Sequence, residues 1–423
     1  MVESKKTKDM LGRDGLISVD KAIEILTAQL NTVPLINETI PLSEAFDRVL
    51  AEPLTSPENL PAASRSTMDG YAVRAADTFG ASQSMPCYLD ITGEVLMGEK
   101  PVGELKKGGC YKIPTGGLIP TGADSVVMFE DTVPVDDTVI EIVKGVGSGS
   151  NLIKTGEDIA KNAKALPAGH LLRPQDLGLL AGLGISEVNV FKRIRVAIVS
   201  TGDEIIPFTG IPQPGQIRNI NAIALAGMVR RAGALYTDYG IVSDKQDVFF
   251  AALEEAIKDN DIVLFSGGSS VGVKDLGERA VENFGPPGIL VHGVTLKPGK
   301  PILIGSSGNT PVFGLPGHPV SALVCFDLFV KPAITLLRGI STNPELPILT
   351  LPATLSRNIN SAPGRRDLVR VTLQHESGKW VAYPILGKSG SISTLSRANG
   401  YFIINEESQG ITENSNVKVY IYQ

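Results

Sequence analysis

The chain has 423 residues, enough for roughly two to four domains of ordinary size. Hydrophobic residues make up 43% and charged residues 20%, a balance typical of folded globular proteins and unlike that of disordered chains. The formal net charge of -6 argues against a nucleic-acid binder, because affinity for a phosphate backbone comes from clustered Lys and Arg.

Apolar residues at helical spacing follow Ser18, a favourable N-cap residue, and predict an amphipathic helix that ends before Pro34. From about residue 53 to 150, short alternating or β-branched runs divided by Gly and Pro turns predict a β-rich domain. Helical signals return over 173–185. Because this piece is similar in character to residues 17–52, we expect the β-rich domain to be inserted into a helical one.

After Arg193 the pattern becomes strand, helix and strand, with strands expected at 195–199, 240–242 and 261–265 and helices at 222–231 and 248–258. Apolar strands alternating with helices predict a parallel sheet covered on both faces, whose ligands bind at the carboxyl ends of the strands. After Gly339 the chain is β-like again, which predicts a small C-terminal β-barrel or sandwich.

Sequence features that bear on the compartment are few. The cysteines, Cys87, Cys110 and Cys325, form no CxxC pair and predict neither a disulfide framework nor a thiolate metal site. The polar N-terminus is unlike a signal peptide, and we expect no stretch long and apolar enough to cross a bilayer. These observations favour a cytoplasmic protein that binds neither nucleic acid nor membranes.

Two polar segments follow expected buried strands. Asp203 and Glu204 come after a glycine turn and could hold a cation or orient a hydroxyl, although a solvated turn is the simpler interpretation. The second segment contains Ser266, Gly267 and Gly268, with Asp275 just beyond. Its glycines and successive N–H groups could cradle a phosphate, and plain turn geometry remains the alternative.

Three further groups of residues could carry chemistry. Lys297 and Lys300 flank a Pro-Gly turn that would fix two positive charges, unless they are ordinary surface lysines. Residues 314–322 resemble a rigid loop that leads into a helix. Acidic and hydroxyl residues also occur in or beside the β-rich insertion, where turn carboxylates are an equally good interpretation. His170, His292 and His375 have no metal-ligand spacing, so we expect structural or surface roles.

Taken in order, these segments closely resemble the molybdopterin molybdenumtransferase family, which includes bacterial MoeA and the C-terminal domain of gephyrin. The resemblance covers nearly the whole chain after about Gly15. The matching segments are 68–72, 114–116, 156–158, 200–204, 266–268, 297–301, 314–317 and 363–365.

The resemblance implies an architecture of multidomain α/β plus β type. It comprises an elongated helical domain in two pieces (15–54 and 157–192), an inserted β-rich domain (55–156), a parallel-sheet α/β molybdopterin-binding domain (193–343) and a C-terminal β-barrel-like domain (344–423). It also implies a homodimer whose active site combines the α/β domain of one subunit with the inserted domain of the other.

The family reaction takes adenylylated molybdopterin and molybdate, releases AMP and leaves molybdenum on the dithiolene. The resemblance implies catalytic roles for Asp69, Thr115, Asp158, Asp203, Glu204 and Asp275. It implies substrate binding by Ser266, Gly267, Gly268, Lys297, Lys300, Pro301, Ser321, Arg365 and Ser391. Mg²⁺ would be held by Asp244 and Asp275. Tungstate is a possible second oxyanion, and transient contact with a molybdopterin adenylyltransferase is expected.

Three positions depart from the family pattern. His318 stands where members commonly have Asn, Arg218 where relatives often have an acidic residue, and Gly293 where some bacterial members have Lys. A neutral His can replace one Asn hydrogen bond but not both. Two alternative functions fit the sequence less well than this resemblance: a molybdopterin adenylyltransferase or related nucleotide-processing enzyme, and a gephyrin-like scaffold.

Overall fold

The computed structural model describes residues 15–267, 271–340 and 349–422, with the backbone alone for 271–275. The chain divides into two compact units. The first unit contains the described residues up to Glu38, Asp47–Val49 and those from Phe191 onward. The second unit contains Thr39–Phe46 and Leu50–Val190. Each unit is described by itself below.

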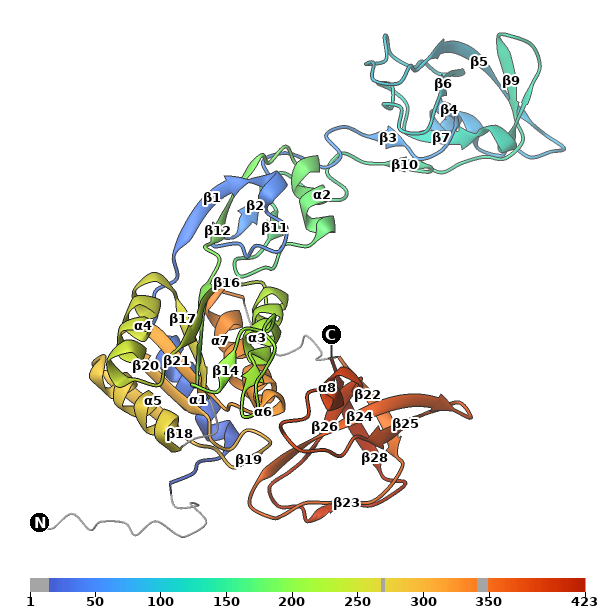
Figure 1. Cartoon of the computed structure of the whole chain (residues 1–423). Coiled ribbons are helices and arrows are strands. Elements are labelled where there is room, and N and C mark those ends of the chain that lie inside the picture. Colours follow the sequence, from blue (N-terminus) through green and yellow to red (C-terminus); the bar gives the residue numbers. More distant parts are fainter. Residues whose placement is uncertain (1–14, 268–270, 341–348, 423) are drawn as a thin grey trace, which may run out of the picture. The chain divides into compact units, whose positions relative to one another are not determined.

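The first unit is built on a six-stranded sheet, labelled in Figure 1. Its strand order is β16 (Leu235–Val242), β13 (Arg195–Thr201), β17 (Ile262–Gly267), β21 (Thr310–Leu315), β20 (Leu303–Ser307) and β18 (Pro287–His292). The pairs β16–β13, β13–β17 and β17–β21 are parallel, as predicted. The sheet is not parallel throughout: β18 and β20 pair antiparallel, and β20 and β21 form a hairpin, whose short turn can join only antiparallel neighbours.

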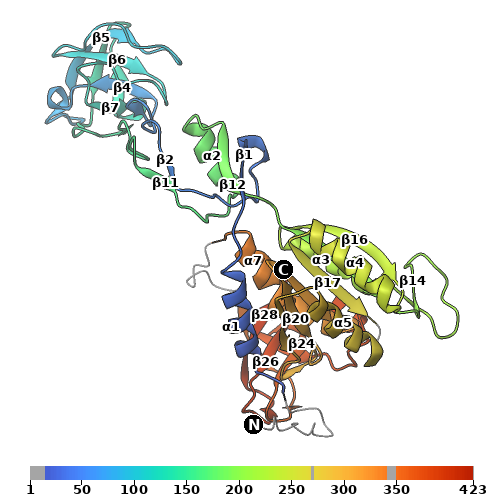
Figure 2. The same cartoon turned by 90° about the vertical axis from the view of Figure 1, so that its left-hand side faces the viewer.

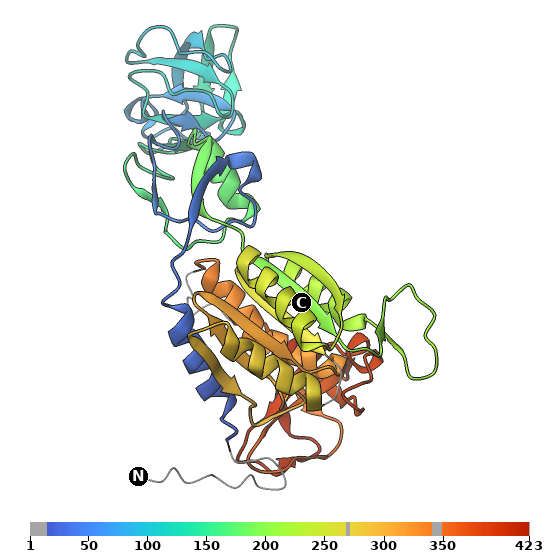
Figure 3. The same ribbon diagram turned by 60° about the vertical axis from the view of Figure 1, so that its left-hand side comes forward.

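Helices cover both faces of this sheet. Along β13, Val196 and Ile198 point to one face, while Ala197 and Val199 point to the other. The first face packs against α1 (Val19–Leu30), α3 (Ile220–Arg231), α6 (Pro319–Cys325) and α7 (Lys331–Leu337). The second packs against α4 (Gln246–Asp259) and α5 (Val271–Asn283), which lie along the sheet in Figure 3.

Helix α1 begins where the sequence predicts, with the Ser18 side chain accepting a hydrogen bond from the Lys21 N–H. Its buried residues belong to the same core as α7 and β18 of the first unit. The resemblance instead implies a domain that combines this helix with 157–192. The four domain boundaries drawn there remain a prediction.

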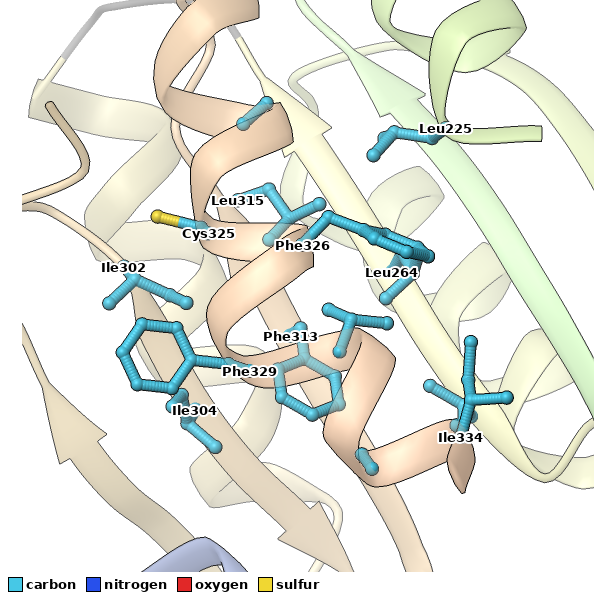
Figure 4. Packing of buried hydrophobic residues seen from close by; sticks show 14 of the residues in the cluster. Leu225, Leu264, Ile302, Ile304, Phe313, Leu315, Cys325, Phe326, Phe329 and Ile334 are labelled. Atoms are coloured by element: carbon cyan, nitrogen blue, oxygen red, sulfur yellow. The ribbon is translucent and has the colours of Figure 1, made fainter. Parts of the chain in front are cut away.

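The segment Pro319–Leu337 joins α6 and α7 through a π-helical turn, η4 (Phe326–Val330). It is long and apolar enough to cross a membrane, with a mean hydropathy of 1.9, so the expectation that no such stretch exists is wrong. However, 61% of the apolar stretch within this segment is buried inside the protein. Figure 4 shows Phe329 near Ile304 and Phe313 of the sheet and Phe326 near Leu264, which is how a central core helix acquires an apolar sequence.

A closed barrel forms the C-terminal part of the first unit, as the sequence predicts; its strands are seen from a second direction in Figure 2. The barrel contains β24 (Arg366–Glu376), β25 (Lys379–Pro384), β22 (Thr350–Leu355), β28 (Asn416–Ile421) and β26 (Gly400–Ile404), and a β24–β26 pairing closes it. Its smaller elements are β23 (Ile359–Asn360), β27 (Gly410–Ile411) and α8 (Ser393–Ser396). The short strand β19 (Leu296–Lys297) adds to β24 from outside.

The second unit contains the inserted sheet, with strands β7 (Ser125–Met128), β4 (Gly70–Val73), β6 (Gly109–Ile113), β5 (Cys87–Glu94), β9 (Val139–Ile142) and β8 (Thr132–Pro134) in that order. The chain enters and leaves this sheet through the antiparallel pair β3 (Arg65–Ser66) and β10 (Leu152–Ile153). The β-rich texture predicted for 53–150 is confirmed.

The rest of the second unit has less helix than the sequence suggests. It contains α2 (Pro174–Gly182) and the pair β2 (Leu54–Thr55) and β11 (Lys164–Leu166). Strands β1 (Asn37–Pro41) and β12 (Glu187–Phe191) also pair with each other. In β12, the alternation of buried Val188 and Val190 with more exposed neighbours is a strand period, which explains the difference.

Asp176 stabilises the start of α2. Its carboxylate accepts hydrogen bonds from the Arg173 backbone N–H (2.8 Å) and Nε (2.9 Å), and lies 2.9 Å from His170 Nε2. The Arg173 side chain holds the pKa of Asp176 well below its ordinary value of 3.8. A depressed folded-state pKa contributes stability above the unfolded value, and this stability is lost as pH falls through the folded value.

We therefore expect Asp176→Asn to lower the free energy of unfolding at pH 7 by about 1.5–3 kcal/mol, the usual contribution of hydrogen bonds to a charged group. The difference from wild type should shrink as the pH falls below about 3.8, because the wild-type carboxylate then begins to lose its advantage. Urea unfolding at pH 7 and at successively lower pH measures both values. An equal difference at every pH would contradict the assignment.

Candidate active site

A cleft of about 1310 Å³ opens in the first unit, between loops of the α/β sheet and one side of the barrel. The sheet contributes Gly267 at the end of β17 and the loops 297–301 and 314–318. The barrel contributes residues around β24 and the segment 385–389. The cleft therefore brings together six of the predicted residues, which are Gly267, Lys297, Lys300, Pro301, Ser321 and Arg365.

The position of Lys297 is set by strand pairing. Leu296 lies beside Arg366 and Lys297 beside Asp367 in the parallel β19–β24 pair. Gly299 follows with a φ of +123°, and a Cβ there would lie 2.8 Å from Cys325 Sγ. A side chain is thus excluded at this turn, and the backbone between the two lysines has one fixed path.

Asp367 is a site residue that the sequence analysis missed. Its carboxylate accepts hydrogen bonds from Arg365 Nε (2.8 Å) and Nη2 (3.3 Å), and Lys297 Nζ lies 3.7 Å away. The residue is 4% exposed. Two cations predicted to bind an oxyanion therefore already share one carboxylate. The position of Asp367 directly after Arg365 and Arg366 indicates a possible ion pair, but only the strand register shows that Lys297 is also close to it.

Arg370 is the second residue that the sequence analysis missed. It borders the cleft and is 8% exposed. Its Nη2 donates a weak 3.4 Å hydrogen bond to Gly387 O, while Nε and Nη1 have no partner. Burial lowers the pKa of this guanidinium below its ordinary value. Because an uncompensated buried charge is costly, an anion in the cleft would offset the charge of Arg370.

His318 and Ser389 connect the two walls of the cleft. Ser389 Oγ lies 2.9 Å from His318 Nδ1, and the Val320 N–H donates to Ser389 O at 3.1 Å. These contacts hold the segment that carries Lys388 against the start of α6. Ser321 lies in the same helix and borders the cleft, whereas Ser391 lies just beyond the lining residues.

The predicted phosphate-binding turn is only partly described. Ser266 is buried at the end of β17, and Gly267 borders the cleft. Gly268 lies outside the described residues. The Asp275 side chain also lies outside the description, although its backbone belongs to α5.

Two of the predicted acidic residues meet at the carboxyl ends of β13 and β16. Asp203 Oδ1 accepts hydrogen bonds from Ser243 Oγ (3.3 Å) and the Asp244 N–H (3.4 Å). Thr201 Oγ1 donates to Asp244 Oδ1 at 2.5 Å. Glu204 folds back over Gly202, where a Cβ would lie 2.8 Å from Glu204 Oε2. None of these acids borders the described cleft.

This acidic pair fits a magnesium ion in its chemistry. Among side chains that the structure describes, no three potential metal ligands gather at one point. Asp203 and Asp244 nevertheless supply two hard oxygen ligands. Mg²⁺ usually takes one or two carboxylates from a protein and completes its shell with phosphate oxygens and water.

The remaining predicted residues lie in the second unit. The Thr115 N–H donates to Asp69 Oδ1 at 2.6 Å, and this bond lowers the pKa of the fully exposed Asp69 carboxyl. A hollow of about 250 Å³ borders Asp69, with Met97 and Phe129 in its lining. Asp158 is exposed in a loop where its N–H donates to Leu60 O at 3.1 Å.

Family models match three consecutive regions of the chain. They are described as MoeA N-terminal region (domain I and II) over 17–184, probable molybdopterin binding domain over 197–336, and MoeA C-terminal region (domain IV) over 352–422. The chain belongs to the MoeA family.

Individual MoeA relatives match over most of their length. Molybdopterin molybdenumtransferase 2 of Mycobacterium tuberculosis is 35% identical over 389 residues, covering 90% of this chain and 94% of the relative. The molybdopterin molybdenumtransferase of Bacillus subtilis is 32% identical over 388 residues, covering 91% and 89%. The crystal structure of the MoeA protein of Pyrococcus horikoshii OT3 superimposes with a TM-score of 0.82 at 33% identity, covering 96% of this chain and 100% of that one.

The three departures from the MoeA pattern have different structural settings. His318 borders the cleft and contacts Ser389. Arg218 instead donates to Gly210 O at 2.9 Å and is not a lining residue of the cleft. Gly293 has a φ of +79°, and a Cβ would lie 2.6 Å from Leu16 Cδ2, so a lysine would be strained here.

The Asp69–Thr115 contact gives a measurable prediction. Thr115→Ala removes the hydroxyl but keeps the backbone N–H, which is the larger cause of the lowered Asp69 pKa. We therefore expect the Asp69 pKa to move upward but to stay below its ordinary value, in a carboxyl-carbon NMR titration. Asp136, whose pKa is lowered by Thr138, is the internal control and should not change. A full return to the ordinary value, or no change, would contradict this geometry.

Proposed function

We propose that this chain inserts molybdate into adenylylated molybdopterin and releases AMP in a Mg²⁺-dependent reaction, the final step of molybdenum cofactor biosynthesis. The chain is a transferase of this biosynthesis, since it belongs to a family of molybdopterin molybdenumtransferases. The reaction balances if water hydrolyses the phosphoanhydride and AMP leaves. The two dithiolene sulfurs then replace one oxygen of molybdate, which leaves as water with the two thiol protons.

The observation that carries this proposal is the charge of the cleft. Among its described lining residues are five cationic side chains, those of Lys297, Lys300, Arg365, Arg370 and Lys388, and two carboxylates, those of Glu278 and Asp367. The whole chain carries a net charge of -6. A concentrated positive charge inside an acidic protein selects small anions such as molybdate, tungstate or a terminal phosphate.

The cleft residues would bind two anions, the oxyanion and a phosphate of the substrate. Arg370, Arg365 and Lys297 would bind the oxyanion through charge-assisted hydrogen bonds, with Ser321 and Ser391 as further donors. The backbone at Gly267 and Gly268 would cradle a phosphate of the substrate. Pro301 would keep the turn after Lys300 rigid, which limits the movement of both lysines.

Asp244 and Asp275 would hold Mg²⁺, and Asp203 lies next to Asp244. The ion would supply positive charge to the phosphoanhydride oxygens. Asp203 and Glu204 would keep the strand ends in shape through their contacts with Asp244 and Gly202. Thr201 would fix the Asp244 carboxylate in place.

We also propose a cytoplasmic homodimer in which Asp69, Thr115 and Asp158 act on the site of the partner subunit. Their second unit offers an exposed, ionised Asp69 beside a small hollow. Transient contact with the enzyme that adenylylates molybdopterin would follow from a shared intermediate.

The oxyanion assignment predicts an order of effects on the half-saturating molybdate concentration, measured by AMP release from adenylylated molybdopterin and Mg²⁺. Removing the 8%-exposed Arg370 as Arg370→Ala should cost about 2–5 kcal/mol of binding. Lys297→Ala should cost about 0–1 kcal/mol, because its side chain is 59% exposed. Arg365→Ala, at 35% side-chain exposure, should lie between them.

Lys107→Ala, which removes an exposed lysine of the second unit, is the matched control and should leave the molybdate dependence unchanged. Thermal unfolding verifies that each variant is folded. AMP release that does not depend on an oxyanion would sink the proposed reaction. An unchanged half-saturating molybdate concentration in all three cleft variants would show that the oxyanion does not bind at these residues.

The shared site predicts complementation. Asp69→Ala and Asp275→Ala chains should each be inactive, but hybrid dimers formed by subunit exchange should regain activity at one intact site. About one quarter of the wild-type rate is expected at full random exchange, because half of the dimers are hybrids with one working site each. A mixture that stays inactive although exchange is demonstrated by differential tags would rule out action in trans.

A further inference from the structure

Asp367 occupies a place in the cleft that the proposed reaction leaves unexplained. It lies on β24, directly across from Lys297 of β19 and two residues after Arg365, so all three side chains can lie on the same face of the strand pair. Both carboxylate oxygens are engaged, Oδ1 by Arg365 Nε and Oδ2 by Arg365 Nη2 and Lys297 Nζ. A resident anion therefore sits among the cations that would receive the oxyanion.

The carboxylate orients Arg365 through two hydrogen bonds, but it is not needed to place Lys297. The Lys297 backbone is fixed by its β19–β24 pairing and by the turn at Gly299. Its ammonium lies 3.7 Å from Asp367, longer than a hydrogen bond, and its side chain is 59% exposed. Arg365 uses only the Nε and Nη2 edge towards Asp367. The main effect of Asp367 on a nearby ligand is therefore its charge.

A dianion that enters this cleft meets that charge at close range. Arg365 and Lys297 together carry two positive charges, and Asp367 cancels one of them. Because the 4%-exposed carboxylate is poorly screened by water, its repulsion of a dianion is stronger than that of a surface acid. Arg370, whose Nε and Nη1 have no hydrogen-bond partner in the described structure, is a further cation that lines the cleft.

We propose that Asp367 is a built-in counter-ion that weakens the binding of the oxyanion, so that the oxyanion is held loosely enough to be transferred. The inference rests on the proposed oxyanion roles of Lys297 and Arg365. An enzyme gains no rate from tight ground-state binding of a substrate it must pass on, and a competing carboxylate is one way to limit that binding. Asp367 acts by partly neutralising its two cationic partners and does not itself bind the oxyanion.

The test uses the full chain and titrates sodium tungstate or sodium molybdate by calorimetry. Asp367→Asn keeps an acceptor for Arg365 but removes the charge, so the Kd should fall at least about fivefold. The half-saturating molybdate concentration should fall in parallel with the Kd. The kcat should fall too, because a more tightly held oxyanion is transferred more slowly. This split between tighter binding and slower turnover is not produced by structural damage alone. The gain in affinity should diminish at high ionic strength.

Matched variants separate charge from shape. Asp367→Ser is a second neutral replacement that should reproduce the tighter binding, and Asp367→Glu, which keeps the charge, should bind like wild type. Asp137→Asn removes an exposed carboxylate of the second unit and should change nothing.

Unchanged or weaker oxyanion binding in folded Asp367→Asn and Asp367→Ser would overturn the inference, as would equal tightening in Asp367→Glu. The same titration on Lys297→Ala and Arg365→Ala distinguishes failure of the proposed oxyanion site from failure of the counter-ion role of Asp367. If those variants bind the oxyanion as well as wild type, the proposed oxyanion site itself is wrong. If they bind less tightly while the neutral Asp367 variants show no gain, the site stands and the counter-ion role falls.

Discussion

The parallel pairing of β19 with β24 is the contact on which the cleft depends. It joins a strand from a loop of the α/β sheet to the outside of the barrel, and Arg366 N donates to Thr295 O at 2.8 Å to extend it. Leu296 and Leu368, one from each strand, belong to one buried cluster. Backbone hydrogen bonds fix the register of β19 and β24, and the burial of apolar side chains stabilises the contact between the two walls of the cleft. The charged side chains of the cleft therefore do not have to stabilise this contact.

A second constraint is electrostatic. The cleft gathers cations in an acidic chain, and each is compensated to a different degree. Arg365 is bonded to Asp367, whereas Arg370 lacks hydrogen-bond partners at two nitrogen atoms. Their neighbour Arg366, which is bonded to Asp20 (2.9 and 2.8 Å), does not line the cleft. Burial lowers the pKa of the Arg370 guanidinium, so the protein keeps this charge at an energetic disadvantage that an anion would relieve. At Arg370 of β24, an uncompensated buried charge lowers the stability of the fold but favours the binding of an anion.

The sequence predicts those features that depend on local spacing. The helix at Val19–Leu30 and the buried strand at Arg195–Thr201 follow from their periodicity. The antiparallel β20 could not be predicted in this way, because pairing joins residues that no local pattern relates. The same holds in the cleft. Arg365, Arg366 and Arg370 are chemically equal in the sequence, and only the register of β24 assigns them different partners. The Pro-Gly turn singled out Lys297 and Lys300 and the resemblance supplied Arg365, whereas Asp367 and Arg370 required the fold.

The way the chain enters the inserted sheet has a consequence for how such proteins can evolve. β3 and β10 run antiparallel as a two-stranded ribbon, with Ser66 opposite Leu152, and β2 and β11 continue the same antiparallel course. Both ends of the inserted segment therefore leave side by side. A segment of this kind can be acquired, exchanged or lost by recombination without opening the core of its host, because the host only has to accommodate a hairpin.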